Sequence, residues 1–263
     1  MKKLIALLPL VVLCLMMGCT TPSGVEVTQY FPINNNYINL YISDGMLVTV
    51  SDDVDEVVIT GDENVMEKVK VESSSNNLRI YRKDIAIAYP TKTEVLIPHN
   101  ASLRKVEVNM DSEFSTGYGL AGDEITVQVE SRSKFFGYIM AEKLNLKIAD
   151  NSDAYVTFDV YELMNLRMSG SSSADLDGDA ENVSLDIQDN SSNENNWNSG
   201  YYAFSCDECY GNINNNCKLY INCFSEISVN LSNNSFLHYT SNPYVDDSYV
   251  DGTSGLIYDG YKK

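Results

Sequence analysis

One short pattern recurs through the second half of the chain and constrains the fold more than any other feature. In "LNLKIADNS", residues 144–152, apolar residues alternate with polar ones, and the stretch ends at a serine. Similar stretches, with apolar residues six and four positions before a serine, end at Ser112, Ser133, Ser152, Ser172, Ser191, Ser235 and, with one of the two apolar residues replaced, Ser254. These anchor serines are 21, 19, 20, 19, 44 and 19 residues apart, and the gap of 44 is close to two repeats.

A unit of about 20 residues suits one turn of a parallel β-solenoid. Alternation with period 2 indicates strands, and a helix pair needs about 33 residues or more. Coils stacked ~4.8 Å apart would align equivalent apolar residues into one continuous core. We therefore predict an all-β fold with clear repeats over residues 101–260. A β-sandwich is the alternative, because two sandwich strands of 8–12 residues would also give a period near 20.

The preceding part of the chain also favours strands. From residue 37 to about residue 100 the sequence contains short alternating runs without sustained helical periodicity. "VKVESSSNNLRIYR", residues 69–82, has two such runs joined by a Ser/Asn turn, which predicts a β-hairpin. "DENVMEKV", residues 62–69, could form one helical turn at most. We expect a β-rich N-terminal part that leads into the solenoid.

The start of the chain is typical of an exported protein. Lys2 and Lys3 precede an apolar stretch over residues 4–17. That stretch is too short for a comfortable membrane span and matches the hydrophobic region of a signal peptide.

The end of this segment, "MMGC", resembles the lipobox of bacterial lipoproteins. The resemblance implies that residues 1–18 are a lipoprotein signal peptide and that Cys19 carries acyl chains such as palmitate. Each buried methylene contributes ~0.8 kcal/mol, so several chains anchor a protein stably. We expect a protein anchored to the outer membrane on its periplasmic or cell-surface face, with residues 19–26 as a tether. A secreted protein with an unmodified Cys19 is the alternative.

The net charge excludes one class of partner. The chain has 37 acidic and 18 basic residues, a formal net charge of −19. A surface this negative repels phosphate backbones, so we expect no nucleic acid partner.

Several segments resemble a known family. They are residues 48–51, 57–64 and 77–80, the Ser-Gly corner at 169–172 and the closing strand at 255–260. In these segments the sequence resembles the "putative auto-transporter adhesin, head GIN domain" family, found largely in Bacteroidetes lipoproteins. The resemblance covers about residues 27–260 and implies a right-handed β-helix outside the cytoplasm, with an adhesive role. Residues 192–226 depart from the family pattern and are interpreted as a cysteine-containing insertion.

Four cysteines cluster in that segment, namely Cys206, Cys209, Cys217 and Cys223. In an exported protein an even number of cysteines favours disulfides. A nested pairing, Cys206 with Cys223 and Cys209 with Cys217, would staple an irregular protrusion. A four-thiolate zinc site is an alternative but usually has a longer central spacer, and a thioredoxin-like role needs a βαβ context. We predict disulfides and no metal.

An aromatic cluster precedes the cysteines. Trp197, Tyr201 and Tyr202 lie among Asn, Ser and Gly residues. Aromatic anchors in a polar loop suit recognition, so these three are candidate contacts for a glycan or an extracellular protein ligand. The alternative is a capping loop whose aromatic rings cover the last coils.

Two other patterns give weaker indications. The alternating aspartates of "DLDGDAEN", residues 175–182, could bind calcium, but Gly178 is not where an EF-hand loop turns and no bidentate Glu ends the loop. A solvated Asp-Gly corner is the alternative. His99 and His238 have no matched partners in the sequence, and no set of catalytic residues emerges.

These observations predict a non-catalytic cell-envelope lipoprotein without a cofactor. It would act as an adhesion or ligand-binding module on a β-solenoid scaffold. A rigid structural component of the envelope is the first alternative, and a carbohydrate-active enzyme is the second.

Overall fold

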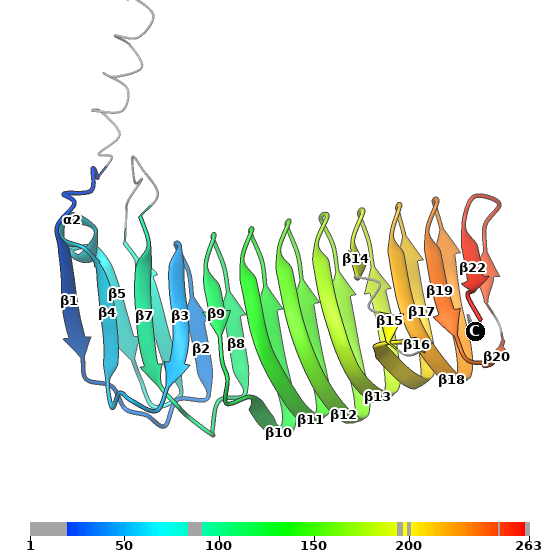
Figure 1. Cartoon of the computed structure of the whole chain (residues 1–263), viewed down its shortest axis with the longest axis horizontal. Helices are drawn as coiled ribbons and strands as arrows, with labels where there is room; N and C mark the ends of the chain where they lie inside the picture. The colour runs from blue at the N-terminus through cyan, green and yellow to red at the C-terminus, as the bar shows by residue number, and fades with distance from the viewer. Residues whose placement is uncertain (1–19, 84–90, 194–196, 199–200, 247, 261–263) are drawn as a thin grey trace, which may run out of the picture.

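The computed structural model describes residues 20–83, 91–193, 197–198, 201–246 and 248–260. The predicted signal peptide and Cys19 lie outside these residues. The described chain is nearly all β and coils into a solenoid of about seven turns (Figure 1), which confirms the predicted solenoid. One helical turn, α2 (Glu63–Met66), lies where a single turn was expected. No helix in the described part is both long and apolar enough to cross a membrane.

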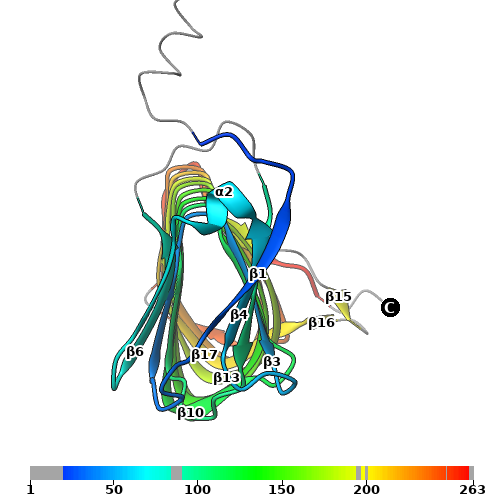
Figure 2. The same cartoon turned by 90° about the vertical axis from the view of Figure 1, so that its left-hand side faces the viewer.

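Each coil consists of two walls joined at two edges. A typical strand runs along the first wall, passes a bend and returns along the second wall. The longest strands are β10 (Leu120–Val129), β11 (Lys134–Ile148), β12 (Asp153–Met168), β13 (Ser173–Ile187), β17 (Phe204–Asn214) and β18 (Lys218–Ser232). The walls converge at one edge and separate toward the other (Figure 2). The anchor serines lie at the narrow edge, which we call the serine corner. We call the opposite edge the bend.

The core consists of files of equivalent residues in parallel register. Leu146 lies beside Leu166, and Leu166 beside Leu185. All three side chains are at most 2% exposed. A second file continues through Ile148, Met168, Ile187, Ile213 and Leu231. This stacking of coils excludes the β-sandwich alternative.

The serine corner explains the repeated polar residues. Two consecutive residues there have positive φ angles, for example Asp150 and Asn151 at 58° and 60°. Asp and Asn tolerate this left-handed conformation better than other side chains. The buried anchor serine then accepts a hydrogen bond from the backbone N–H of the equivalent residue one coil earlier, as Ser152 does from Ser133 at 3.1 Å. The anchor serine therefore satisfies a buried donor.

Cys217 takes the serine position in the coil that the sequence repeat obscured. Its backbone N–H donates to Ser235 Oγ at 3.2 Å, as an anchor serine would. Strands β17 and β18 are regular coils in register with β13. Among the described residues of 192–226, β15 (Trp197–Asn198) and β16 (Tyr201–Tyr202) pair with each other as a two-stranded antiparallel sheet. Most of the predicted insertion over residues 192–226 therefore belongs to regular coils.

The N-terminal part belongs to the same solenoid, but its order in space differs from its order in sequence. The coil of β2 (Asn39–Ile42) and β3 (Met46–Ser51) lies between two later coils. One is formed by β6 (Asn77–Arg82) and β7 (Thr93–Pro98), the other by β8 (Lys105–Val108) and β9 (Glu113–Ser115). The coil that comes first in sequence is therefore internal.

The two ends of the solenoid are closed differently. At the N-terminal end, β1 (Glu26–Phe31), β4 (Val57–Asp62) and β5 (Val69–Ser73) pair antiparallel with their neighbours. The α2 turn lies at the narrow edge of this end (Figures 1 and 2). The predicted hairpin is the β5–β6 pair. At the C-terminal end, β19 (Phe236–Thr240), β20 (Tyr244–Val245), β21 (Tyr249–Val250) and β22 (Gly255–Tyr258) continue the parallel stacking.

Candidate functional site

The bends differ in length from coil to coil. Between Val160 and Leu163, β12 has two residues where β13 has only Glu181. Likewise β18 has two residues opposite Asp207 of β17. Extra residues in one strand of a pair re-aim side chains. In the two longer bends, Tyr161 and Phe224 project outward, with 59% and 52% of their surface exposed.

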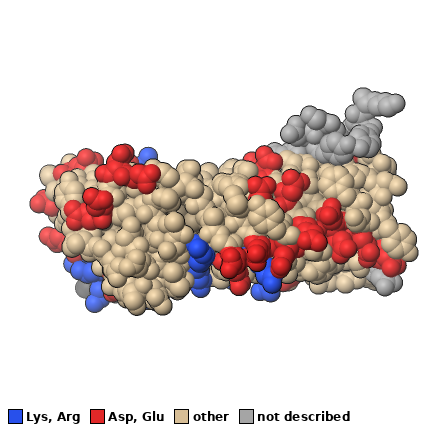
Figure 3. Space-filling view, turned by 90° about the horizontal axis from the view of Figure 1, so that it is seen from below, with Lys and Arg blue, Asp and Glu red and all other residues tan. Residues whose placement is uncertain are grey.

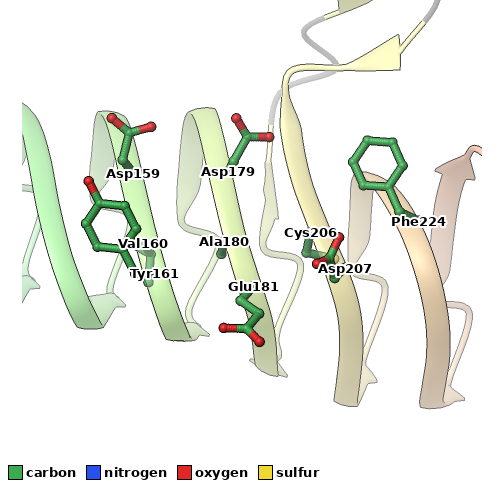
Figure 4. Close-up of a pocket in the computed structure, with 9 residues that line it drawn as sticks. All are labelled: Asp159, Val160, Tyr161, Asp179, Ala180, Glu181, Cys206, Asp207 and Phe224. Carbon is green, nitrogen blue, oxygen red and sulfur yellow. The ribbon is translucent and has the colours of Figure 1, made fainter.

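The two shorter bends lie between these longer ones and leave a hollow of about 290 Å³. Its floor consists of Val160, Ala180 and Cys206. Figure 4 shows Tyr161 and Phe224 at opposite ends, with carboxylates between and beside them. We define the underside groove by its six exposed side chains, Asp159, Tyr161, Asp179, Glu181, Asp207 and Phe224.

The underside groove is strongly acidic. Asp159 and Asp179 are directly opposite each other on adjacent strands, about 4.8 Å apart along the solenoid axis. Between residues 151 and 260 the sequence has 17 acidic residues and only two basic ones, Arg167 and Lys218. Figure 3 shows acidic side chains forming a belt along the underside of this half of the molecule.

The carboxylate of Asp159 changes the pKa of a neighbouring tyrosine, Tyr138. Tyr138 donates a hydrogen bond to Asp159 at 2.6 Å. This hydrogen bond raises the pKa of Tyr138 to about 12. Asp159 therefore has a hydrogen-bond donor from the adjacent strand at the edge of the underside groove.

Three of the four cysteines lie together at the groove floor, where Cys206 contacts Cys209 and Cys223. Cys206 is directly opposite Cys223 on the adjacent strand, and hydrogen bonds with Cys209 and Cys223 raise the pKa of the Cys206 thiol. All four cysteines are buried free thiols in the structure, so the predicted disulfides are not formed in it. Among the described residues, no cluster of His, Cys, Asp or Glu is arranged to hold a metal ion.

The geometry also contradicts one of the predicted pairs. Cys217 lies at the serine corner, where its thiol donates to the carbonyl oxygen of Asn214 at 2.9 Å. Cys209 lies near the bend, and the strand from Cys209 to Asn214 spans ~16 Å at ~3.3 Å per residue. A disulfide needs Cα atoms within ~7 Å, so Cys209 and Cys217 cannot pair in this fold. The Cys206–Cys223 pair stays a prediction.

Strands β15 and β16 form a short hairpin, which we call the aromatic hairpin. It projects sideways from the C-terminal half of the solenoid (Figure 2). The backbones of Trp197 and Tyr202 pair in it, as do those of Asn198 and Tyr201. Tyr202 is only 4% exposed, and its ring packs edge-on against Tyr220 at 5.2 Å. Burial of Tyr202 favours the capping interpretation for this residue. The ligand role of Trp197 and Tyr201 stays a prediction.

A histidine–carboxylate pair holds this hairpin in place. His238 Nδ1 lies 3.0 Å from Asp259 Oδ2, and the Tyr202 hydroxyl donates to the same oxygen. The His238 ring stacks on Tyr220 at 4.8 Å. Sequence reasoning missed this pair, although its separation of 21 residues is close to one repeat. Because the four side chains bind one another, the pair joins the last coil to the hairpin.

The alternating aspartates lie within strand β13, so they form neither a calcium loop nor an Asp-Gly corner. Asp175 and Asp177 face outward from the first wall, and burial together with the charge of Asp177 raises the pKa of Asp175. Gly178 is required by the close approach of the neighbouring strand. A Cβ atom there would lie 1.9 Å from the carbonyl oxygen of Phe158.

Several solved structures of bacterial proteins share this fold. A "putative adhesin" from Parabacteroides merdae superposes with a TM-score of 0.74 at 16% identity, over 92% of this chain and 96% of that one. A "putative adhesin" from Parabacteroides distasonis gives 0.76 at 15% identity, over 90% and 99%. A "putative lipid binding protein" from the same organism gives 0.75 at 12% identity, over 90% and 98%. Identities this low establish a shared fold alone.

Sequence comparison gives the family. No curated protein matches the chain. The model of the family described as "Putative auto-transporter adhesin, head GIN domain" matches residues 36–243, which is most of the chain. The protein therefore belongs to this family.

Proposed function

We propose that this protein is a non-catalytic cell-envelope lipoprotein that binds a ligand or a neighbouring surface through the bends of its solenoid. The observation that carries this proposal is the underside groove. There, large aromatic side chains and carboxylates are exposed around a hollow, whereas the anchor serines of the serine corner are buried. The adhesin description of the family points in the same direction.

The scaffold suits a binding role. A continuous core through about seven coils makes the solenoid a rigid body, and each coil presents outward side chains that packing does not constrain. Binding residues are commonly found on variable segments held by such a scaffold. The alternative of a rigid spacer predicts no ligand at the bends.

The enzyme alternative has its own test at the underside groove. The described residues that line the groove include four carboxylates and two aromatic side chains. A glycan-cleaving enzyme uses two carboxyl groups as acid and base at defined positions, whereas a binding module needs no such pair. If the protein is non-catalytic, incubation with anionic polysaccharides releases no new chain ends. Release of such ends would support the enzyme alternative.

The proposed anchor at Cys19 has its own test. We expect the mature protein to carry acyl chains on this residue, detected by mass spectrometry of the N-terminal peptide or by labelling with a palmitate analogue. A Cys19→Ser variant should lose the label and leave the membrane fraction. An unmodified N-terminus beyond residue 19 would contradict the anchor and favour the secreted alternative.

The binding role can be tested on whole cells. Cells that carry the full chain should be retained on at least one surface from a panel of extracellular matrix proteins and glycans, more than cells without it. A Tyr161→Ala/Phe224→Ala variant, present in equal amount, should reduce retention. Equal retention of cells with and without the protein on every surface would favour the spacer alternative.

A further inference from the structure

We infer that the underside groove binds an extended, cationic protein segment with Lys or Arg at alternate positions. This inference rests on the proposed binding function and names the class of partner. Its basis is the combination of a hollow, two exposed aromatic rings and carboxylates that form no ion pair with any described residue.

The groove carboxylates differ from many others on the protein. Elsewhere, carboxylates lie beside cations, as Glu107 does beside Lys105 at 2.6 Å and Glu130 beside Lys147 at 2.5 Å. Within the part of the chain that the structure describes, none of the four groove carboxylates lies within 4.0 Å of a Lys, Arg or His nitrogen. A cationic partner would supply the missing counter-charge, and charge complementarity of this kind gives specificity and fast association.

The aromatic rings add a second requirement. Tyr161 and Phe224 project at the two ends of the hollow, more than half exposed. Ammonium and guanidinium groups bind aromatic faces, and the methylene stems of Lys and Arg pack on apolar surface. Carboxylates framed by aromatic rings therefore favour Lys and Arg side chains over a neutral sugar, which would not require the charge.

The dimensions favour an extended segment. Tyr161, Glu181, Asp207 and Phe224 occupy successive coils, so the two rings are three coil steps or ~14 Å apart along the axis. Four residues of extended chain cover ~13 Å, and alternate side chains are ~6.7 Å apart on one face. Two cationic side chains thus fit between the rings. A volume of about 290 Å³ suits side chains of a larger partner rather than a whole small ligand.

The direct test uses the full chain in detergent and a defined probe. The probe is the peptide fluorescein-Gly-Lys-Ser-Lys-Ser-Lys-Gly-amide, labelled at its N-terminus, and the matched control peptide has Gln in place of each Lys. We expect anisotropy to rise with the Lys peptide only, and the affinity to fall by about tenfold or more between 50 and 300 mM NaCl because the contacts are ionic.

Variants locate the site. Asp179→Asn/Asp207→Asn should weaken binding of the Lys peptide by about tenfold or more, and Phe224→Ala by about threefold. Asp53→Asn/Asp123→Asn, which removes two exposed carboxylates outside the groove, should change it less than about twofold. On the unaltered protein, a carbodiimide should cross-link the peptide lysines to Asp179, Glu181 or Asp207.

The outcomes separate this inference from the proposed function. Equal binding of the Gln peptide, an equal loss in the control variant, or cross-links confined to other carboxylates would overturn the inference. If cells carrying the protein are nevertheless retained through Tyr161 and Phe224 on a neutral glycan surface, the binding function stands and the cationic partner is wrong.

Discussion

The two edges of each coil are built on opposite principles. At the serine corner, coil after coil uses two left-handed residues and a buried hydroxyl or thiol at the same position. At the bend, the number of residues changes between coils, and so do the side chains, from Tyr161 to Glu181 to Phe224. The comparison teaches that residues repeated in every coil are those that the fold requires. Residues that vary between coils form the surface that is free to bind a ligand.

The largest expected difference is in the free energy of unfolding, between a substitution in a core file and a substitution at the bend. Leu166→Ala removes a fully buried side chain between Leu146 and Leu185, and we expect a loss of ~2–5 kcal/mol in the free energy of unfolding. Phe224→Ala removes a ring that is 52% exposed and should cost less than ~1 kcal/mol. Urea denaturation measures both. Similar losses would mean that the bend is part of the core.

A smaller effect is expected at the serine corner. Ser152→Ala leaves the buried backbone N–H of Ser133 without its acceptor and should cost ~1–3 kcal/mol. Cys217→Ser restores the usual anchor residue and should change the free energy of unfolding by less than ~0.5 kcal/mol. Substantial destabilisation by Cys217→Ser would show that the thiol has a role that a hydroxyl cannot fill.

Neutralising the underside groove should not destabilise the protein. Asp179→Asn/Asp207→Asn removes two exposed like charges, so we expect the free energy of unfolding to stay the same or to rise by up to ~0.5 kcal/mol. The measurement is urea denaturation at low and high salt. A loss above ~1 kcal/mol would mean that these carboxylates stabilise the fold and would weaken the contrast between corner and bend.

The smallest effect concerns an exposed ion pair at the serine corner. Arg132 hydrogen-bonds Asp111 at 2.6–2.7 Å and lowers the pKa of that carboxyl. The pair therefore stabilises the protein above the ordinary pKa of Asp, and this stabilisation is lost as the pH falls through the lowered value. Asp111→Asn should lower Tm at pH 7 by no more than about 2 °C. The difference from the unaltered protein should shrink as the pH falls through the lowered pKa of Asp111.

Most of the solenoid could be predicted because the same residue types recur at equivalent positions of successive coils. Alternating apolar residues and an anchor serine repeat wherever a coil packs on a similar coil, and this holds from Ser112 onward. The missing anchor, Cys217, could have been found if a small thiol had been accepted in place of serine. The order of the N-terminal coils could not be predicted, because the place of β2 and β3 depends on pairings with strands far along the chain.

The underside groove was not predictable for a different reason. It arises from one extra bend residue beside Tyr161 and another beside Phe224, and this difference has meaning only once the register is known. The aromatic cluster that the sequence does display, around Trp197, led instead to a hairpin whose Tyr202 is buried. Aromatic content alone does not distinguish a cover from a binding surface.

The internal position of the β2–β3 coil has a consequence for how the chain assembles as it is synthesised. Residues 39–51 precede both of their neighbours, β6–β7 and β8–β9, in the chain. One edge of this coil has no partner until about residue 98 is available, and the other edge has none until about residue 115. Beyond that point each new coil docks on one already made, so growth of the structure can follow growth of the chain.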